Sequence, residues 1–269
     1  MIELKNVSKI YNGKVIFEDV NLKLEEGKVA AFVGHNGCGK STMLKVISGL
    51  IRKDRGEIIY EKNYRFSYVP EKFPIINMSA IDFLKHMAEI DGIYAKNDGL
   101  AHIHKLAKDF YMENMLRKPM KVLSKGTLQK VGVIQALMSN PEVLILDEPL
   151  SGQDADSQEV FIEKIKNLKK QGTIILLSAH EPELIRSLAD SVYTIHECKI
   201  SKYENVPQTT YVIWMAVDMG MTPSPEMKKA ENGYVVLSDE RMLSHEINRL
   251  QREGWHIGKV YENCKHDQI

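Results

Sequence analysis

Several features are scarce or absent in this sequence, and each absence excludes a class of protein. Only 3 cysteines occur among 269 residues, too few and too scattered for a disulfide framework or a metal-ligand cluster. The formal net charge is zero, so overall charge gives no reason to expect binding to nucleic acid. No apolar run reaches bilayer-spanning length, and the N-terminus lacks a signal-peptide pattern. We therefore expect reduced thiols and a cytoplasmic chain that relies on another protein for any membrane part.

The first two hundred residues alternate between strand-like and helix-like patterns. Continuous apolar runs, typical of strands buried on both faces of a sheet, are VAAFVG (29–34), VLIL (143–146) and TIILLS (173–178). Apolar residues at helical spacing predict helices starting at Lys40, over 78–118 and near 156–170. The first of these helices would carry Met43, Leu44, Ile47 and Leu50 on one face. This rhythm predicts an α/β domain with a mainly parallel sheet.

Near residue 206 the pattern changes, which suggests a domain boundary between 1–206 and 207–269. Strands are expected at YVIWMAV (211–217), YVVL (234–237) and WHIGKVY (255–261). A helix with Leu243, Ile247 and Leu250 on one face would begin after a cap at Ser238 or Asp239 and end at Gly254. The C-terminal segment is therefore predicted to be a small α+β domain.

The stretch GHNGCGKST (34–42) fits the phosphate-loop pattern G-x-x-x-x-G-K-[ST]. It lies between a predicted strand and a predicted helix, which is the context that such a loop requires. Its glycines let backbone N–H groups face a phosphate, and the helix N-terminus favours the negative charge. We expect Lys40 to bridge the β- and γ-phosphates and Ser41 to hold Mg²⁺.

Two carboxylates follow the strand at 143–146. Asp147 would reach the magnesium shell, and Glu148 would polarise the attacking water as a general base.

The arrangement of six motifs resembles the ATP-binding cassette (ABC) ATPases over residues 1–205. Besides the phosphate loop and the Asp147–Glu148 pair, LSKGTLQ (123–129) resembles the family's LSGGQ signature, and SGQD (151–154) resembles its D-loop. SAH (178–180) ends a strand where the family has its switch histidine, and YVPE (68–71) stands where a glutamine usually occurs. The resemblance implies a P-loop NTPase fold of the ABC type, with a mixed, mainly parallel core sheet and a helical subdomain at about 75–140.

The resemblance also implies specific roles. Glu148, His180 and Lys40 would be catalytic, and Ser41, Glu71 and Asp147 would hold Mg²⁺. The residues that would contact ATP are Tyr11, Gly34, Asn36, Gly37, Cys38, Gly39, Lys40, Ser41, Thr42, Ser124, Lys125, Gly126 and Asp154. In this family two subunits pack head to tail, so the signature of one chain would meet the γ-phosphate bound by the other.

The sequence departs from the family pattern at a few positions. Lys125 replaces a signature glycine, and Thr127 replaces a glutamine. Glu71 replaces the usual glutamine and adds a negative charge near the triphosphate. With a glutamate at this position and an SKG signature, the sequence resembles those ABC ATPases that energise exporters. Cys38 within the loop is either a small space-filling residue or a redox-sensitive thiol.

We therefore expect the ATPase subunit of an ABC transporter, leaning toward export of a drug, peptide or similar substrate. It would act as a homodimer on the cytoplasmic face of the membrane, beneath a separate permease and without nucleic acid. Two alternatives stay open: a soluble ABC ATPase acting on ribosomes or DNA, and a regulator that barely hydrolyses ATP. The C-terminal domain would be an accessory element, or would only cover an edge of the main domain.

Overall fold

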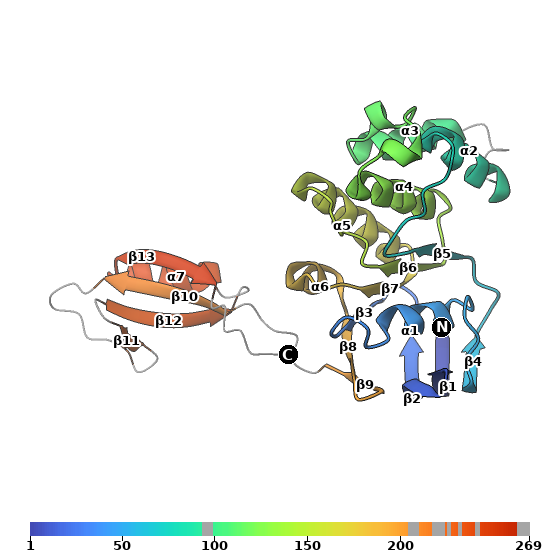
Figure 1. Cartoon of the computed structure of the whole chain (residues 1–269). Helices are drawn as coiled ribbons and strands as arrows, with labels where there is room; N and C mark the ends of the chain where they lie inside the picture. The colour runs from blue at the N-terminus through green and yellow to red at the C-terminus, as the bar shows by residue number, and fades with distance from the viewer. Residues whose placement is uncertain are drawn as a thin grey trace. The chain divides into compact units, whose positions relative to one another are not determined.

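The computed structural model describes residues 1–92, 99–203, 210–216, 224, 227–230, 233–239 and 243–262. It divides into two compact units, Met1–Glu204 and Asn205–Ile269 (Figure 1). Val206, Pro207, Val217 and Cys264, which the sequence-based predictions include, lie outside the described residues.

A six-stranded sheet forms the centre of the first unit, in the order β5-β6-β7-β3-β8-β9. The strands are β5 (Phe66–Val69), β6 (Val143–Asp147), β7 (Ile174–Ser178), β3 (Val29–Val33), β8 (Ser191–His196) and β9 (Lys199–Lys202). The first five run parallel, and β9 is antiparallel to β8. All five residues of β6 and all five of β7 are buried, because the sheet is covered on both faces. The prediction of a mainly parallel sheet is confirmed.

A second, antiparallel sheet has the order β2-β1-β4 and consists of β1 (Ile2–Tyr11), β2 (Lys14–Leu24) and β4 (Arg55–Tyr60). β1 and β2 are joined by Asn12 and Gly13, which both have positive φ angles of 47° and 78°. This conformation suits a two-residue hairpin turn and favours Asn-Gly. Between the two sheets packs one hydrophobic cluster, which contains Phe32 of β3, Phe17 of β2 and Leu44.

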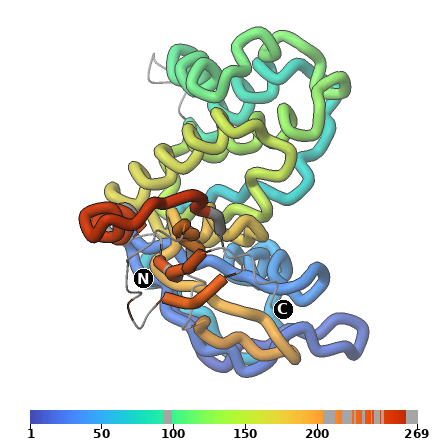
Figure 2. Tube along the Cα trace, turned by 90° about the vertical axis from the view of Figure 1, so that its left-hand side faces the viewer, coloured from blue at the N-terminus to red at the C-terminus, as the bar shows by residue number. Residues whose placement is uncertain are grey.

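Helices α4 (Lys125–Met138), α5 (Ala155–Lys170) and α6 (Pro182–Leu188) cover the opposite face of the six-stranded sheet. Helices α2 (Ala80–Ile90) and α3 (Gly99–Asp109) pack against α4, and short 3₁₀ turns lie at Glu113–Met115 and Met120–Val122. Figures 1 and 2 show α2, α3 and α4 together at one end of this unit, far from β1 and β2. Alternate residues of β3 divide between the two cores, since Ala31 packs against the cluster that includes these helices and Phe32 against the other.

One prediction about these helices needs correction. The helix α1 (Lys40–Ile47) ends before Leu50, which is 62% exposed, because Gly49 with a φ of 77° stops the helix. The stretch 78–118, which the sequence predicts to be helical, contains α2, α3 and the 3₁₀ turn at Glu113–Met115, and its residues 93–98 lie outside the described part.

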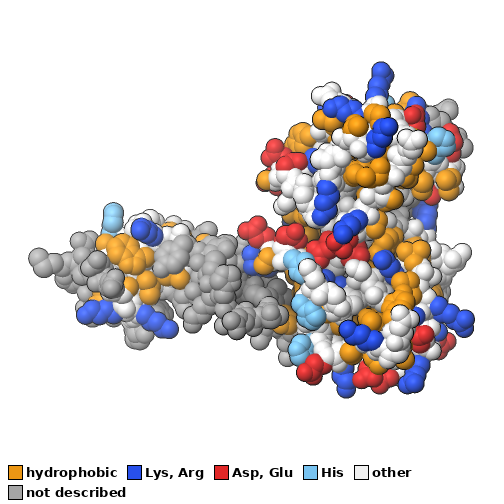
Figure 3. Space-filling model, in the orientation of Figure 1, with side chains coloured by type: hydrophobic (Ala, Val, Ile, Leu, Met, Phe, Trp, Pro, Cys, Tyr) orange, Lys and Arg blue, Asp and Glu red, His pale blue; other side chains and the backbone are white. Residues whose placement is uncertain are grey.

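The second unit has one antiparallel sheet in the order β11-β12-β10-β13. Its elements are β10 (Thr210–Ala216), β11 (Lys228–Ala230), β12 (Gly233–Asp239), α7 (Leu243–Arg252) and β13 (Ile257–Glu262). A small core includes Ile213, Met215, Leu250 and Trp255. Figure 3 shows apolar and basic side chains side by side on the face of this unit that is turned to the viewer.

Strand β11 was not expected from the sequence, and the predicted helix caps are wrong. Ser238 and Asp239 belong to β12, where they pair with Tyr211 and Thr210. Ser238 is 6% exposed, and its pairing with β10 continues the strand past the point where polar residues suggested a cap.

Candidate active site

The phosphate loop connects β3 to α1, as the sequence predicts. Gly34, Gly37 and Gly39 have φ angles of 144°, 82° and 114°, which side chains rarely allow. A Cβ on Gly39 would also lie 2.8 Å from the Cγ2 atom of Ile16. Among the residues that the structure describes, no side chain caps the N-terminus of α1. Its first backbone N–H groups are therefore available to an anion.

Lys40 is 6% exposed and lies across its own loop. Its Nζ atom donates to the carbonyl oxygens of Gly34 and His35, at 2.7 Å and 3.3 Å. The same atom is 3.3 Å from Nε2 of His180. The ammonium group is thus held over the loop where phosphate oxygens would bind.

Asp147 is 2% exposed and accepts three hydroxyl hydrogen bonds. Ser41 Oγ and Ser178 Oγ donate to Oδ1 at 3.0 Å and 2.7 Å, and the Tyr68 hydroxyl donates to Oδ2 at 3.0 Å. Burial and the nearby Asp147 carboxylate raise the pKa of Tyr68, so this phenol keeps its proton and acts as a donor. The carboxylate is therefore fixed from α1, β5 and β7 together.

Glu148 follows Asp147 with a φ of 49°, an uncommon conformation for a residue with a side chain. Its Oε1 atom lies 3.1 Å from His180 Nε2, and that nitrogen is 3.0 Å from Asn36 Oδ1. Burial raises the pKa of the Glu148 carboxyl, while His180 and Lys40 act in the opposite direction. A carboxylate with a raised pKa beside the phosphate loop is suited to general-base work.

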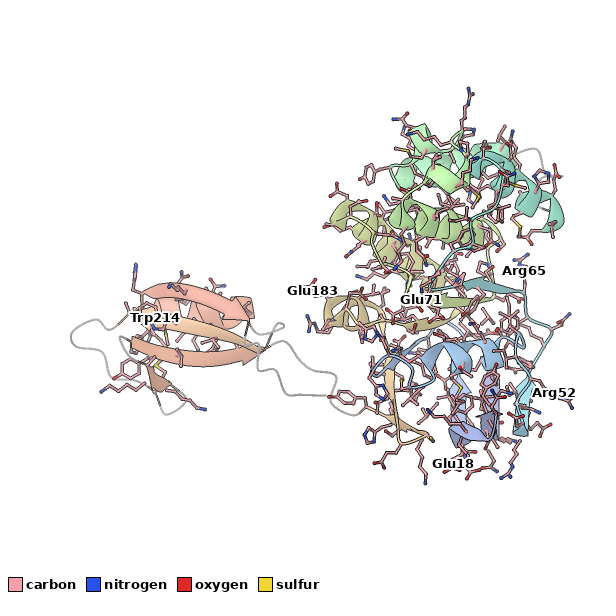
Figure 4. The ribbon with its side chains drawn as sticks, viewed as in Figure 1. Glu18, Arg52, Arg65, Glu71, Glu183 and Trp214 are labelled. Atoms are coloured by element: carbon pink, nitrogen blue, oxygen red, sulfur yellow. The ribbon has the colours of Figure 1, made fainter. Side chains whose placement is uncertain are left out.

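These groups meet at one cavity of about 480 Å³. It is lined by Ile16, Asn36, Gly37, Gly39, Lys40, Ser41, Thr42, Glu71, Glu148, Ser151 and His180. Glu71 lies in the loop after β5, between the sheet and the helical end of the unit (Figure 4). The cavity is large enough for much of a nucleotide and carries both cationic and carboxylate groups.

Tyr11 and Cys38 are not among the lining residues. Tyr11 is 43% exposed, and the Lys9 ammonium lies 4.8 Å from the centre of its ring. Cys38 packs beside Ile16 against the cluster between the two sheets, and a Cβ on Gly34 would come within 2.9 Å of its sulfur. The structure thus places Cys38 as a packing residue of the loop, which supports the space-filling interpretation.

The signature residues lie at the start of α4, outside this cavity. Ser124 caps the helix by accepting from Thr127 N, and Lys125 donates from Nζ to Ser151 Oγ at 2.8 Å. Asp154 pairs with Lys130 at 2.7 Å and caps α5 by accepting from Ser157 N. Hydrogen bonding to Lys130 and then to Ser157 keeps the pKa of Asp154 well below its ordinary value.

Comparisons with known proteins identify the family. The sequence model for the ABC transporter family matches residues 17–151. A lantibiotic transport ATP-binding protein, SrtF of Streptococcus pyogenes, is 32% identical over 208 residues, 74% of this chain and 89% of SrtF. The chain belongs to the ABC transporter family.

Other members of the family agree with this assignment. The zinc import ATP-binding protein ZnuC of Wigglesworthia glossinidia brevipalpis is 32% identical over 73% of this chain and 83% of its own length. A solved ATP-binding subunit of an ABC transporter aligns with a TM-score of 0.67 at 28% identity, over 76% of this chain and 89% of the other. The predicted ABC-type fold is confirmed, and this ABC protein is an ATP-binding, ATP-hydrolysing motor subunit. Among the described residues, no helix is long and apolar enough to span a membrane.

Sequence reasoning missed four residues that organise this ABC site. Tyr68 and Ser178 hold Asp147, Gln129 donates to the carbonyl of Pro70 at 2.8 Å, and Lys130 pairs with Asp154. Polar residues within an otherwise apolar helical segment are the signal that could have found Gln129 and Lys130, since both lie in the part of α4 where every residue from 128 to 134 is buried. Tyr68 and Ser178 carry no such signal, because their partner lies on a different strand.

Proposed function

We propose that this ABC ATPase powers transport as a homodimer beneath a permease that is a separate chain. The observation that supports this most strongly is the convergence of Lys40, Glu148 and His180 on one cavity at the phosphate loop. In the proposed reaction, Glu148 accepts a proton from the water that attacks the γ-phosphate, and Lys40 offsets the negative charge of the phosphates. His180 holds Glu148 and the γ-phosphate in line through Nε2.

We also propose that Ser41, Asp147 and Glu71 hold Mg²⁺ with the nucleotide. All three offer oxygen atoms, which are the ligands that Mg²⁺ prefers. Ser41 Oγ and Asp147 Oδ1 lie 3.0 Å apart. The described residues contain no group of three or more His, Cys, Asp or Glu side chains that could hold a metal alone. Phosphate oxygens and water would therefore supply most of the shell, as is usual for Mg²⁺. When bound, the ion would withdraw negative charge from the phosphates that Ser41, Asp147 and Glu71 face.

The position of the signature supports the proposed homodimer. Ser124 and Lys125 are exposed and lie outside the cavity of their own chain. In the proposed dimer, Ser124, Lys125 and Gly126 of one chain meet the γ-phosphate on Lys40 of the other. Tyr11, which lies at the end of β1, would stack on the adenine.

Export is the favoured direction. Glu71 and the SKG signature support it, as does the likeness to the lantibiotic transport protein. The similar identity to a zinc import protein keeps import as the competing direction. The permease would dock near Ile75, which is 65% exposed and follows Glu71 by four residues. We propose that residues 207–269 form an accessory domain of the motor.

A membrane pull-down of the tagged chain, with mass spectrometry of bound partners, tests this function. We expect to recover a polytopic membrane protein in stoichiometric amount, to which the chain binds on the cytoplasmic side of the membrane. The family type of that protein would decide between export and import. Recovery of ribosomes or DNA-processing proteins in its place would contradict the proposal and favour the soluble alternative.

A further inference from the structure

The signature and the next residue of α4, Lys130, contact the 151–154 loop of the same chain at three points. Lys125 Nζ donates to Ser151 Oγ at 2.8 Å. Gly126 lies so close to Gly152 that a Cβ on Gly126 would be 2.0 Å from the Gly152 carbonyl oxygen. Lys130 Nζ is 2.7 Å from Asp154 Oδ2, with the Lys130 side chain only 10% exposed. The start of α4 and this loop are therefore packed as one body.

One of these contacts reaches the ATP cavity. Ser151 lines the cavity together with Glu148 and His180, and its N–H donates to the Glu148 carbonyl oxygen at 3.3 Å. Through Ser151, Lys125 therefore contacts the edge of the ATP cavity in its own chain. A glycine, which the family usually has at this position, could not make this contact because it has no side chain.

We propose that Lys125 couples the two ATP sites of the dimer by exchanging one partner for another. In the separate chain its ammonium group holds Ser151. When two chains close on ATP, it leaves Ser151 for the γ-phosphate bound by the partner. The inference rests on the proposed sandwich dimer, but the dimer could form without the Lys125 side chain and without its hydrogen bond to Ser151.

The chemistry of the two partners gives the direction of the exchange. The Ser151 hydroxyl is a neutral acceptor, whereas a phosphate oxygen is ionised and forms a stronger, charge-assisted hydrogen bond with an ammonium group. Lys125 is exposed, so its flexible four-carbon stem is free to move. Release of Ser151 changes the lining of the cavity in the same chain. ATP binding at one site therefore changes the ATP affinity of the other site, and by thermodynamic linkage the effect is the same in both directions.

The exchange predicts opposite effects for the two partners of the bond. Lys125→Met keeps the stem but loses the charge, so ATP should promote dimerisation less well. Ser151→Ala removes the bond that must be broken, so ATP should promote dimerisation better. In the Lys125→Met background, Ser151→Ala should have no further effect, because no ammonium group remains to be released.

The experiment measures the ATP concentration at half-maximal dimerisation, by light scattering during size-exclusion chromatography, in the slow-hydrolysing Glu148→Gln chain. We expect Lys125→Met to raise this concentration about tenfold or more, as for loss of a charge-assisted bond. We expect Ser151→Ala to lower it roughly two- to fivefold, as for loss of a neutral bond. Lys121→Met, which removes an exposed cation from the turn before α4, is the matched control and should change nothing.

Three results would overturn the inference. An unchanged midpoint in Lys125→Met would show that the lysine does not meet the phosphate. A Ser151→Ala effect that persists in the Lys125→Met background would show that Ser151 acts without the lysine. If Glu148→Gln itself stays monomeric with ATP, both the proposed sandwich dimer and the coupling are disproved. If Glu148→Gln does form a dimer and either of the first two results is found, only the coupling is disproved.

Discussion

The two halves of the ATP site in this chain differ in how completely they are built. In the phosphate half, residues 34–42 with Asp147 and Glu148, two charged side chains are buried and hydrogen-bonded within one chain: Lys40 is 6% and Asp147 is 2% exposed. The signature half, residues 123–127 with the loop 151–154, exposes Ser124 and Lys125. The first half is preorganised to bind phosphates, and in the proposed dimer the second would face a partner chain. In that dimer, one protomer would bind ATP while hydrolysis waits for the partner.

The largest effect should come from removing the base of the phosphate half. Glu148→Gln keeps the shape of the side chain but cannot accept a proton, so kcat for ATP hydrolysis should fall about 1,000-fold. ATP binding should persist, because Lys40 and the loop are unchanged. Glu159→Gln, an exposed carboxylate on α5, is the control in a steady-state phosphate-release assay. A Glu148→Gln rate within tenfold of the wild-type rate would mean that another group is the base.

A smaller effect should follow from loosening the buried anchor of the phosphate half. Tyr68→Phe removes only the hydroxyl that donates to Asp147, and a hydrogen bond to a charged acceptor contributes about 2 kcal/mol. Urea unfolding should show a loss of about 1–2 kcal/mol in the free energy of unfolding. Tyr193→Phe is the control, because the Tyr193 ring stacks on Phe32 in the same core cluster. Equal losses in the two variants would remove the special role of Tyr68.

In the signature half, the ion pair between Lys130 and Asp154 should be weaker. Asp154→Asn keeps a good helix cap for α5 but loses the charge opposite a buried ammonium group. Asp154 is 58% exposed, and solvent screening limits the loss in the free energy of unfolding to about 1 kcal/mol.

The pH dependence of this loss has a defined sign. Because the folded-state pKa of Asp154 is lowered, its contribution is present above the unfolded-state pKa of about 3.9 and is lost as the pH falls through the folded value. The difference between wild type and Asp154→Asn, measured by urea unfolding, should therefore shrink below about pH 4. A difference that is constant down to the lowest pH would exclude the ion pair as its cause.

The smallest effect concerns the pH dependence of Glu148. Burial raises its pKa, so the acid limb of kcat should lie at a higher pH than an ordinary glutamate would give. In unfolding, a raised folded-state pKa contributes stability below the unfolded-state pKa of about 4.3, and this is lost as the pH rises through the folded value. Glu148→Gln should lack this loss, so its free energy of unfolding relative to wild type should increase as the pH rises above about 4. A relative stability that stays flat over this range would contradict the raised pKa.

The sequence predicts the phosphate half better than the signature half. A phosphate loop is a continuous segment, so its glycines, Lys40 and Ser41 follow from local spacing alone. Asp147 and His180 were also placed correctly at strand ends, because the carboxyl ends of parallel strands meet at one edge of a sheet. Their roles in catalysis and metal binding stay predictions.

Contacts that depend on strand order or helix packing could not be predicted. Tyr68 meets Asp147 because β5 pairs with β6, although the two residues are 79 positions apart. Lys125 meets Ser151 only because α4 packs on the loop after β6. Nothing in either local pattern names the partner. Ser238 failed as a predicted cap for a related reason, since its polarity suggested a helix start but strand pairing with Tyr211 decided its conformation.

The contact between Gly126 and Gly152 affects how mutations of the signature are interpreted. A methyl group on Gly126 would overlap a carbonyl oxygen of the same chain, with no flexible side chain to give way. Gly126→Ala should therefore push the start of α4 away from the 151–154 loop of the same protomer, independently of any effect on phosphate binding. In this protein, a damaging mutation of the signature glycine therefore reports on the internal fit of a single subunit, even before any contact with a partner chain is considered.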